Sequence, residues 1–212
     1  MGRTRVLLAD DHRMLREALA QLLEPSCQVV GAVADGRALL DSAAALQPDV
    51  VVVDIGMPLL NGLDAARQLK QTMPQVKIVM LTVNEDPDLA AEAIRAGASC
   101  YLLKNSAAAE LVQAIQEAVQ GRTYITPLVA KGLVDALVRH GDSPHEQALA
   151  SSRQREVLQL LVEGRTMKEI ARILKITPRT VAFHKYGMMK RLGVRSTAEL
   201  VKAALRLGVV SN

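Results

Sequence analysis

The sequence predicts a doubly wound α/β domain with five parallel strands, followed by a smaller all-α domain of four helices. Two observations lead to this prediction. Short aliphatic runs alternate with amphipathic stretches over about the first 120 residues, whereas the last 62 residues show helical patterns and no strand pattern. The charge divides as well, because residues 1–150 have a net charge of −5 and residues 151–212 a net charge of +9. Two domains with different partners are indicated, and the basic domain favours a polyanion.

Five short apolar runs are the expected strands. Each has four or five residues, mostly β-branched or aliphatic, and is apolar on both faces, as in parallel strands that helices cover on both sides. The stretches between them repeat apolar residues at helical spacing, as at Leu15, Leu19 and Leu22. Right-handed crossovers then give a flavodoxin-like sheet. The expected strands are residues 6–9, 29–33, 50–53, 78–81 and 100–103.

A linker is expected between the two domains. Thr126-Pro127 can open a short helix, with threonine as the N-cap and proline in the first turn, and the helix should reach about residue 139. A polar stretch that contains Gly141 and Pro144 then breaks it. The expected boundaries are a first domain over 1–122, a linker with one short helix over 123–150, and a second domain over 151–212.

Capping residues and glycines define the four helices of the second domain. Serine and threonine suit the first position of a helix, and glycine suits the position after its end. The expected helices begin at Ser151 or Ser152 and end at Glu163 before Gly164, span 167–174, begin at Thr177-Pro178 and end at 192 before Gly193, and begin at Ser196 or Thr197 and end at 207.

Composition argues against several classes of protein. No apolar run approaches the roughly 18 residues of a membrane span, and the start lacks the roughly 7–15 apolar residues of a secretory signal. We therefore expect a cytoplasmic protein without a membrane partner. Cys27 and Cys100 lie far apart, without a CxxC or Cys/His cluster, so a disulfide scaffold or a zinc site is not expected.

Polar residues follow four of the expected strands. Asp10 and Asp11 follow the first strand and Asp54 the third, while Thr82 and Lys104 follow the fourth and fifth. In a doubly wound sheet, ligands collect at the carboxyl ends of the strands, near the switch in strand order. Three carboxylates there repel one another unless a cation neutralises them, and Mg²⁺ suits such a set of oxygen ligands.

A lysine and a hydroxyl beside a divalent ion are suited to a phosphoryl group. The metal ion and Lys104 neutralise its charge, Thr82 donates a hydrogen bond, and Asp54 is a candidate nucleophile that forms an acyl phosphate. A single aspartate at a strand end is more often a helix cap or turn residue. Five such residues at four strand ends favour one common site.

These residues and their neighbours resemble the receiver domain of bacterial response regulators over residues 4–120. The resemblance rests on Asp10-Asp11, segment 54–62 (DIGMPLLNG), Leu81-Thr82 and segment 101–104 (YLLK). It implies that a sensor histidine kinase phosphorylates Asp54. It also implies that Mg²⁺ is held by Asp10 or Asp11, Asp54 and the backbone carbonyl of Gly56, and that Thr82, Lys104 and Tyr101 act in the switch. From composition alone, Tyr101 would be a core residue.

Residues 170–192 have the layout of a helix-turn-helix. A short helix is followed by a turn at 175–176 and by a second helix, on which Val181 and Met188 belong to an apolar stripe for the core. Another face carries polar, basic and aromatic residues that suit the major groove and adjacent phosphates. A basic helical bundle that docks on protein is the alternative. The expected DNA contacts are Lys168, Thr177, Arg179, Thr180, Phe183, His184, Lys185, Lys190 and Arg191.

The second domain is similar to LuxR-type DNA-binding domains over roughly 151–210. The motifs are REVL at 155–158, KEIA at 168–171, TVAFHK at 180–185 and KRLGV at 190–194. Together with the receiver, the chain resembles a NarL/FixJ-type response regulator. This resemblance implies a transcriptional regulator that binds double-stranded DNA and that dimerises when active. RNA polymerase is a further candidate partner. The resemblance implies dimerisation through the last helix, where the candidates are Ala198, Val201 and Leu205.

Two other functions fit parts of the pattern. A phosphatase with an aspartyl nucleophile would carry a second carboxylate two residues later as acid or base, but Gly56 stands there. We therefore expect no enzymatic activity beyond self-catalysed phosphotransfer and slow autodephosphorylation. The other alternative is a regulator whose receiver pairs constitutively without phosphorylation.

Overall fold

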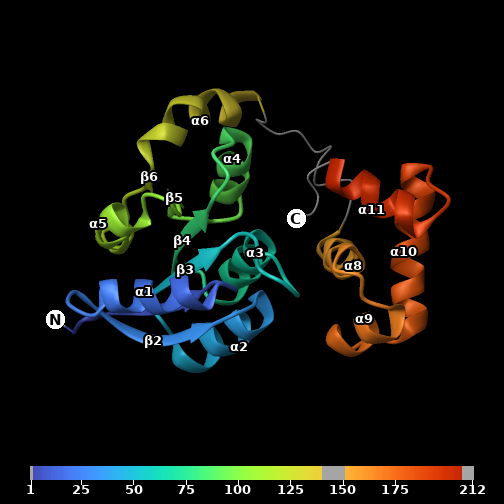
Figure 1. Cartoon of the computed structure of the whole chain (residues 1–212), viewed down its shortest axis with the longest axis horizontal. Coiled ribbons are helices and arrows are strands. Elements are labelled where there is room, and N and C mark those ends of the chain that lie inside the picture. The colour runs from blue at the N-terminus through green and yellow to red at the C-terminus, as the bar shows by residue number, and fades with distance from the viewer. Residues whose placement is uncertain (1, 140–150, 207–212) are drawn as a thin grey trace. The chain divides into compact units, whose positions relative to one another are not determined.

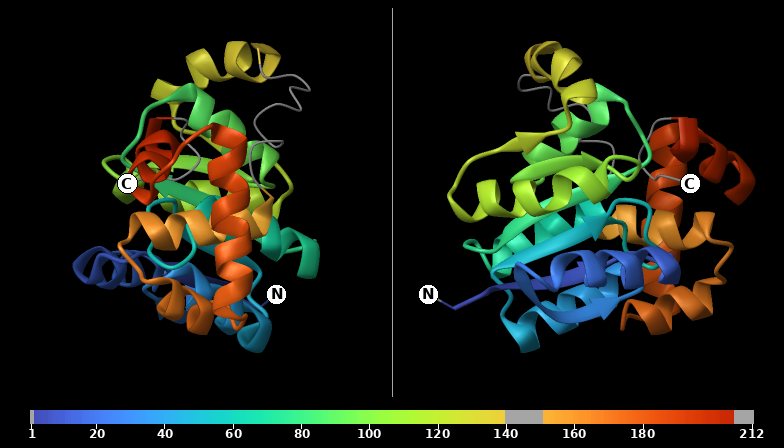
Figure 2. Two further views of the ribbon diagram at one scale, coloured as in Figure 1. Left: turned by 90° about the vertical axis from the view of Figure 1, so that its right-hand side faces the viewer. Right: turned by 60° about the vertical axis from the view of Figure 1, so that its left-hand side comes forward.

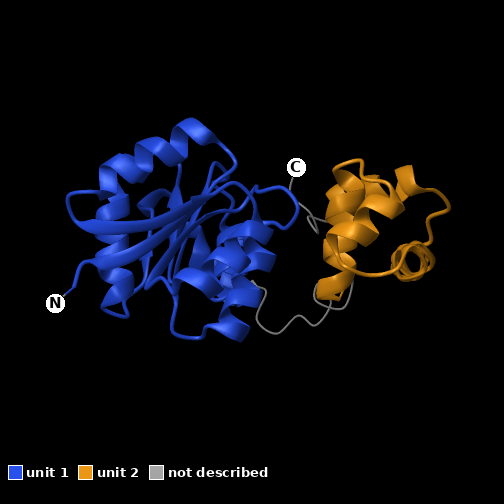
Figure 3. Ribbon diagram, turned by 90° about the horizontal axis from the view of Figure 1, so that it is seen from below, with its two compact units in different colours: residues 1–141 blue, residues 142–212 orange. Residues whose placement is uncertain are grey.

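The computed structural model describes residues 2–139 and 151–206 and contains two compact units, Met1–Gly141 and Asp142–Asn212 (Figure 3). The expected linker segment 140–150 and the expected helix end at residue 207 lie outside the described residues. Among the described helices, none is long and apolar enough to cross a membrane.

The first unit is built on one parallel sheet (Figure 1). The strand order is β2-β1-β3-β4-β5-β6, so the order reverses between β1 and β3, as expected for a flavodoxin-like fold. The two-residue strand β6 was not predicted, because its segment is too short to show a pattern. The strands are β1 (Thr4–Ala9), β2 (Cys27–Val33), β3 (Val50–Asp54), β4 (Lys77–Thr82), β5 (Cys100–Leu103) and β6 (Tyr124–Ile125).

Helices cover both faces of the sheet, as Figure 2 shows. The core between the sheet, α1 and α5 contains Val52, whereas the core between the sheet, α2, α3 and α4 contains the next residue, Val53. This alternation follows from the two-residue period of a strand. The helices are α1 (Arg13–Leu23), α2 (Gly36–Leu46), α3 (Gly62–Thr72), α4 (Pro87–Arg95) and α5 (Ala107–Val119).

Helix α6 (Pro127–Arg139) packs against α4 and belongs to the first unit. Its residues Val129, Leu133 and Ala136 are buried in the same core as α4. The sequence had placed this helix in a linker over 123–150. The structure differs because one face of the helix is apolar and continues the core beyond β6.

The second unit consists of four described helices with the expected caps. The Ser151 hydroxyl accepts a hydrogen bond from the Gln154 N–H, and the Gln154 side-chain oxygen accepts one from the Ser151 N–H, so the two residues form a capping box. Gly164 and Gly193 follow two of the helices with φ of +77° and +66°, the left-handed region that favours glycine. The helices are α8 (Ser152–Val162), α9 (Met167–Ile173), α10 (Pro178–Leu192) and α11 (Thr197–Arg206).

Candidate functional site

Asp54 is the last residue of β3 and lies at the carboxyl end of the sheet, where a loop leads to α3. Gly62, the first residue of α3, donates its backbone N–H to the Ile55 carbonyl at 2.9 Å and closes the loop. A Cβ atom at residue 62 would lie 2.3 Å from the carbonyl oxygen of Asp54, closer than atoms can approach. Only glycine fits there, and it lets α3 begin directly against the strand end.

An acidic pocket forms where β1, β3 and β5 end. Asp10 and Asp54 are 1% and 4% exposed, and the Lys104 ammonium lies 2.7 Å from Asp10 Oδ2 and 2.9 Å from Asp54 Oδ2. The three side chains come from three different strand ends. Lys104 thus bridges two buried carboxylates that would otherwise repel each other.

Backbone groups and a histidine complete this pocket. The other oxygens of the two carboxylates accept backbone N–H groups, Asp10 from His12 at 2.8 Å and Asp54 from Gly56 at 3.2 Å. The His12 ring nitrogen Nδ1 lies 2.7 Å from the exposed Asp11. One ligand atom from each of Asp10, Asp11, His12 and Asp54 can be chosen so that all lie within 4.8 Å of one another. These acidic residues form a pocket consistent with a divalent metal site.

His12 was not predicted as part of this site. Its position directly after Asp10-Asp11 was the available signal, but a histidine next to two aspartates also occurs on ordinary surfaces. Gly56 was predicted through its carbonyl oxygen, and the structure places it in the loop beside Asp54, where its N–H donates to Oδ1.

Burial and charge pairing oppose each other in the pocket. Burial raises the pKa of Asp54, and the nearby Asp10 charge adds to this, while Lys104 and the Gly56 amide act in the other direction. Burial lowers the pKa of Lys104, but its hydrogen bonds with Asp10 and Asp54 and their charges outweigh burial, so the net pKa is raised. Lys104 is therefore held in its charged form.

The predicted switch residues Thr82 and Tyr101 lie on neighbouring strands. Thr82 is buried and accepts the Asn84 N–H at 3.0 Å, while the Tyr101 hydroxyl donates to the Asn84 carbonyl at 3.0 Å. The Tyr101 side chain has no exposed area, as composition had indicated, and burial raises the pKa of its hydroxyl. Asn84 joins the two predicted residues.

Thr126, the residue before α6, is hydrogen-bonded to the end of β5. The Thr126 hydroxyl accepts the Leu103 N–H at 3.2 Å and donates to Glu110 Oε2 at 2.7 Å, and the Thr126 N–H donates to the Tyr101 carbonyl. A polar residue that is only 4% exposed thus ties α6 to the strand that carries Tyr101. Sequence reasoning assigned Thr126 only as a helix cap.

Helix α10 separates a core face from a polar face. Val181 and Met188 are buried, as predicted, and Met189 is buried with them. Thr177 begins the helix and its hydroxyl accepts the Thr180 N–H at 3.2 Å. Of the nine predicted DNA contacts, the exposed ones are Lys168, Thr177, Arg179, Phe183, Lys190 and Arg191, and the half-buried ones are Thr180, His184 and Lys185.

Two aromatic side chains stand on this helix in solvent. Phe183 is 73% exposed and packs edge-on against the His184 ring, with 5.6 Å between ring centroids. Tyr186 is 57% exposed, and the Lys185 ammonium lies 5.5 Å from the centre of its ring. Tyr186 was not among the predicted contacts. An exposed tyrosine next to a lysine makes it a further candidate on this face.

The predicted dimerisation residues lie along α11. Ala198 is exposed, Val201 is half-buried and Leu205 is 39% exposed. Their spacing of three and four places them along one side of the helix. Leu200, Ala203 and Ala204 turn inward instead.

The two units match two known families. Residues 6–116 match the response regulator receiver domain, and residues 149–204 match the luxR family of bacterial regulatory proteins. LiaR of Bacillus subtilis, a transcriptional regulatory protein, is 37% identical over 211 residues, which cover 98% of this chain and 99% of LiaR. MctR of Rhizobium johnstonii, also a transcriptional regulatory protein, is 34% identical and covers 98% of this chain and 95% of its own.

A solved structure of the response regulator RcsB in complex with DNA is similar along the whole chain. The two sequences are 26% identical and the TM-score is 0.62. The match covers 99% of this chain and 100% of the RcsB chain. Another RcsB structure contains two dimers bound to two parallel DNAs.

The receiver pocket and the helix-turn-helix therefore define a two-component response regulator that acts as a transcriptional regulator, not a classical enzyme. The chain belongs to the NarL/FixJ family of response regulators, with a receiver domain and a LuxR-type DNA-binding domain. A sensor histidine kinase is the partner that a receiver domain implies.

Proposed function

We propose that a sensor histidine kinase phosphorylates Asp54 in the cytoplasm, and that the modified chain changes its dimerisation and its binding to promoter DNA. The observation that carries this proposal is the pocket in which Lys104 bridges the buried Asp10 and Asp54 carboxylates. An acceptor carboxylate, an acidic cluster for a cation and a fixed ammonium are the parts that phosphoryl transfer requires.

The donor set fits Mg²⁺. Carboxylate oxygens of Asp10, Asp11 and Asp54 and the carbonyl oxygen of Gly56 would hold it, and hard oxygen ligands are those that Mg²⁺ prefers. When bound, Mg²⁺ neutralises charge on the phosphoryl oxygens. An Asp54 oxygen forms a bond to phosphorus as the P–N bond of the kinase phosphohistidine breaks, and Lys104 offsets the added negative charge.

The added charge then acts on the strand ends. Phosphorylation adds about two negative charges next to Lys104. The Thr82 hydroxyl then donates a hydrogen bond to the phosphoryl group. In the unphosphorylated structure the Thr82 hydroxyl accepts the Asn84 N–H, and the Asn84 carbonyl accepts the Tyr101 hydroxyl. Movement of Thr82 therefore perturbs Asn84 and Tyr101. In this proposal the contact of Tyr101 transmits the change to β5.

Replacement of the acceptor tests the first step. Asp54→Asn should reduce incorporation of labelled phosphoryl from acetyl phosphate with Mg²⁺ to background, because the amide is a poor nucleophile. Asp41→Asn, a change at an exposed aspartate on α2, serves as the matched control and should label like the unmodified chain. Undiminished labelling of Asp54→Asn would show that another residue is the acceptor.

The exposed face of α10 is proposed to enter the major groove. Its basic residues contact phosphates, and Thr180, Phe183 and His184 contact base edges. The Thr177 end of the helix adds backbone N–H groups for a phosphate. The solved RcsB–DNA complex supports DNA as the ligand of this unit.

A salt titration tests this assignment. Lys185→Ala should weaken binding to a duplex selected from random sequence by about tenfold, and should lower the slope of log affinity against log salt by about one, because one phosphate contact is lost. Arg95→Ala removes an exposed cation of α4 and should leave the slope unchanged. An equal slope for Lys185→Ala would remove this residue from the interface.

Dimerisation is proposed to use Ala198, Val201 and Leu205 on α11, and a two-fold operator follows from a two-fold dimer. Sedimentation with and without beryllofluoride and Mg²⁺ separates the phosphorylation switch from constitutive pairing. The switch predicts a larger mass and tighter DNA binding with beryllofluoride. An unchanged mass and affinity would favour the constitutive alternative.

A further inference from the structure

Helix α6 exposes an apolar outer face although its inner face is buried. Leu128, Val134 and Val138 are 63%, 66% and 75% exposed. On the opposite side of the helix, Val129 and Leu133 belong to the core that α6 shares with α4. Three large aliphatic side chains on one short surface helix are more than scattered exposure requires, and such a patch indicates a contact surface.

The outer face has the spacing of a helix-pairing seam. Leu128, Lys131, Asp135 and Val138 follow one another at intervals of three, four and three residues. This is the spacing that keeps one stripe facing a partner helix. The two aliphatic residues form the ends of the seam and the two opposite charges form its centre, and Lys131 and Asp135 are both exposed.

The order of residues in the seam makes it complementary to itself. When two copies of α6 lie antiparallel about a two-fold axis at residue 133, Leu128 faces Val138 of the second copy. Lys131 then faces Asp135 of the second copy, and the reverse pair forms by symmetry. A two-fold interface repeats each contact, so two apolar pairs and two ion pairs form together.

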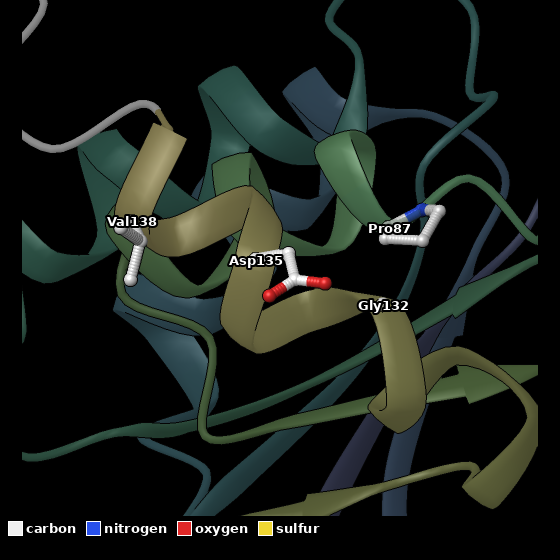
Figure 4. A pocket seen from close by; sticks show the side chains of 4 residues that line it. All are labelled: Pro87, Gly132, Asp135 and Val138. Carbon is white, nitrogen blue, oxygen red and sulfur yellow. The ribbon is translucent and has the colours of Figure 1, made fainter.

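A hollow lies beside the seam. Pro87, Gly132, Asp135 and Val138 line it (Figure 4). A Cβ atom at residue 132 would lie 2.6 Å from Pro87 Cγ, so the close packing of α6 on the start of α4 requires glycine. Two residues of the seam, Asp135 and Val138, therefore border a depression in the surface.

We propose that the outer face of α6 binds the same face of a second copy of this chain in an antiparallel, two-fold pair. The occupant is a second copy because the aliphatic residues and the charged residues both match under one symmetry operation. The pairing goes beyond the proposed function, because it involves only the first unit and requires neither phosphorylation, DNA nor α11.

The pair is small, so its affinity should be weak. A stable specific interface buries about 1,000 Å² or more, and two short helices with three aliphatic side chains each fall at the low end of this scale. Association should therefore appear at roughly micromolar or higher concentration in sedimentation of the full chain. All variants carry Leu205→Glu as a common background, so that pairing through α11 does not contribute.

The first experiment removes the apolar contact. Val138→Glu should raise the dimer dissociation constant by at least about tenfold, because a charge replaces an aliphatic side chain that faces Leu128 of the second copy. Met14→Glu is the matched control, since Met14 is an exposed aliphatic residue of α1, with 84% exposure. It should leave the dissociation constant unchanged. Dimers that survive Val138→Glu, or that Met14→Glu abolishes, overturn the inference.

The second experiment exchanges the charges. Lys131→Glu and Asp135→Lys should each be monomeric alone, because like charges then face each other at the two-fold axis. An equimolar mixture of the two variants should form heterodimers with the dissociation constant of the background chain within a few-fold. Circular dichroism melting checks that each variant is folded.

The mixture separates contacts between chains from contacts within one helix, because neither chain changes on mixing. A mixture that stays monomeric, or a background chain that is monomeric at all concentrations, overturns the α6 pair. Asp54 labelling and DNA binding of the chain without Leu205→Glu are measured in parallel, so the pair can fail while the proposed function stands.

Discussion

The acidic pocket of the first unit and the α10 face of the second unit hold their charges in opposite ways. Asp10, Asp54 and Lys104 come from three strand ends and are largely buried against one another. The α10 face comes from one helix, and most of its basic residues are exposed. Buried charges must be balanced by partners that the fold supplies, whereas exposed charges are balanced by water and salt. Changes in the pocket should therefore affect folding, and changes on α10 should affect mainly binding.

A pair of glycine substitutions gives the largest expected difference between the two regions. Gly62→Ala should destabilise the first unit by about 3 kcal/mol, because the new Cβ would lie 2.3 Å from the Asp54 carbonyl oxygen and the backbone must move. Gly187→Ala in α10 should instead stabilise the second unit by about 0.5–1 kcal/mol, since its nearest neighbour would be Gln154 Nε2 at 3.9 Å.

Urea unfolding of the full chain, followed by a probe in each unit, measures both effects. Gly62→Ala should also reduce Asp54 phosphorylation, because the loop after β3 shifts, while Gly187→Ala should not. If the first unit of Gly62→Ala unfolds at the same urea concentration as that of the unmodified chain, the loop is not tightly packed.

Removal of the bridging lysine is the next largest change. Lys104→Ala should cost about 2–3 kcal/mol of unfolding free energy at neutral pH, because two nearly buried carboxylates lose their counterion. Asp54 has a raised pKa in the folded state, so its ionisation lowers stability as pH rises through that pKa. The variant should therefore recover toward the unmodified chain as pH falls, and Mg²⁺ should stabilise it more than the unmodified chain.

The double variant Lys104→Ala/Asp10→Asn is the control for this prediction. It removes one of the two repelling charges and should be more stable than Lys104→Ala alone. If the single variant unfolds at the same urea concentration as the unmodified chain at every pH, the ion pairs do not contribute to stability.

The smallest expected effect is on the rate at which the cysteines react. Both cysteines lie in the first unit, so this rate reports on the opening of that unit alone. Burial raises the pKa of the Cys100 thiol to about 11, so only about one molecule in a thousand carries the thiolate at pH 8. Cys27 is buried as well, and the sequence has no cysteine in the second unit. Iodoacetamide at pH 8 should therefore label the chain only as fast as the first unit opens. Labelling as fast as a free peptide thiol would contradict the burial of both residues.

Local signals account for what the sequence predicted well. The five longer strands, the caps at Ser151 and Thr177 and the glycines at 164 and 193 all depend on neighbouring residues. Strand β6 and the placement of α6 were not predicted, because two residues carry no period and because an apolar helix face does not reveal what it packs against.

The candidate site likewise contains residues that the sequence predicted and residues that it did not. Asp10, Asp54 and Lys104 were predicted to meet, since parallel strands end at one edge of the sheet. His12 and Asn84 joined the site only in the structure, because their roles depend on backbone geometry and side-chain direction.

The sequence by itself determined the order of the elements other than β6, the acidic and basic halves and the polar residues at the strand ends. The tertiary structure decided which charges pair, that the Tyr101 side chain lies fully inside the core, and which face of α6 remains in solvent. The physical reason is distance along the chain. Hydrophobic period, capping and turns act within a few residues, whereas a lysine 2.7 Å from an aspartate 94 residues earlier requires the whole sheet to form.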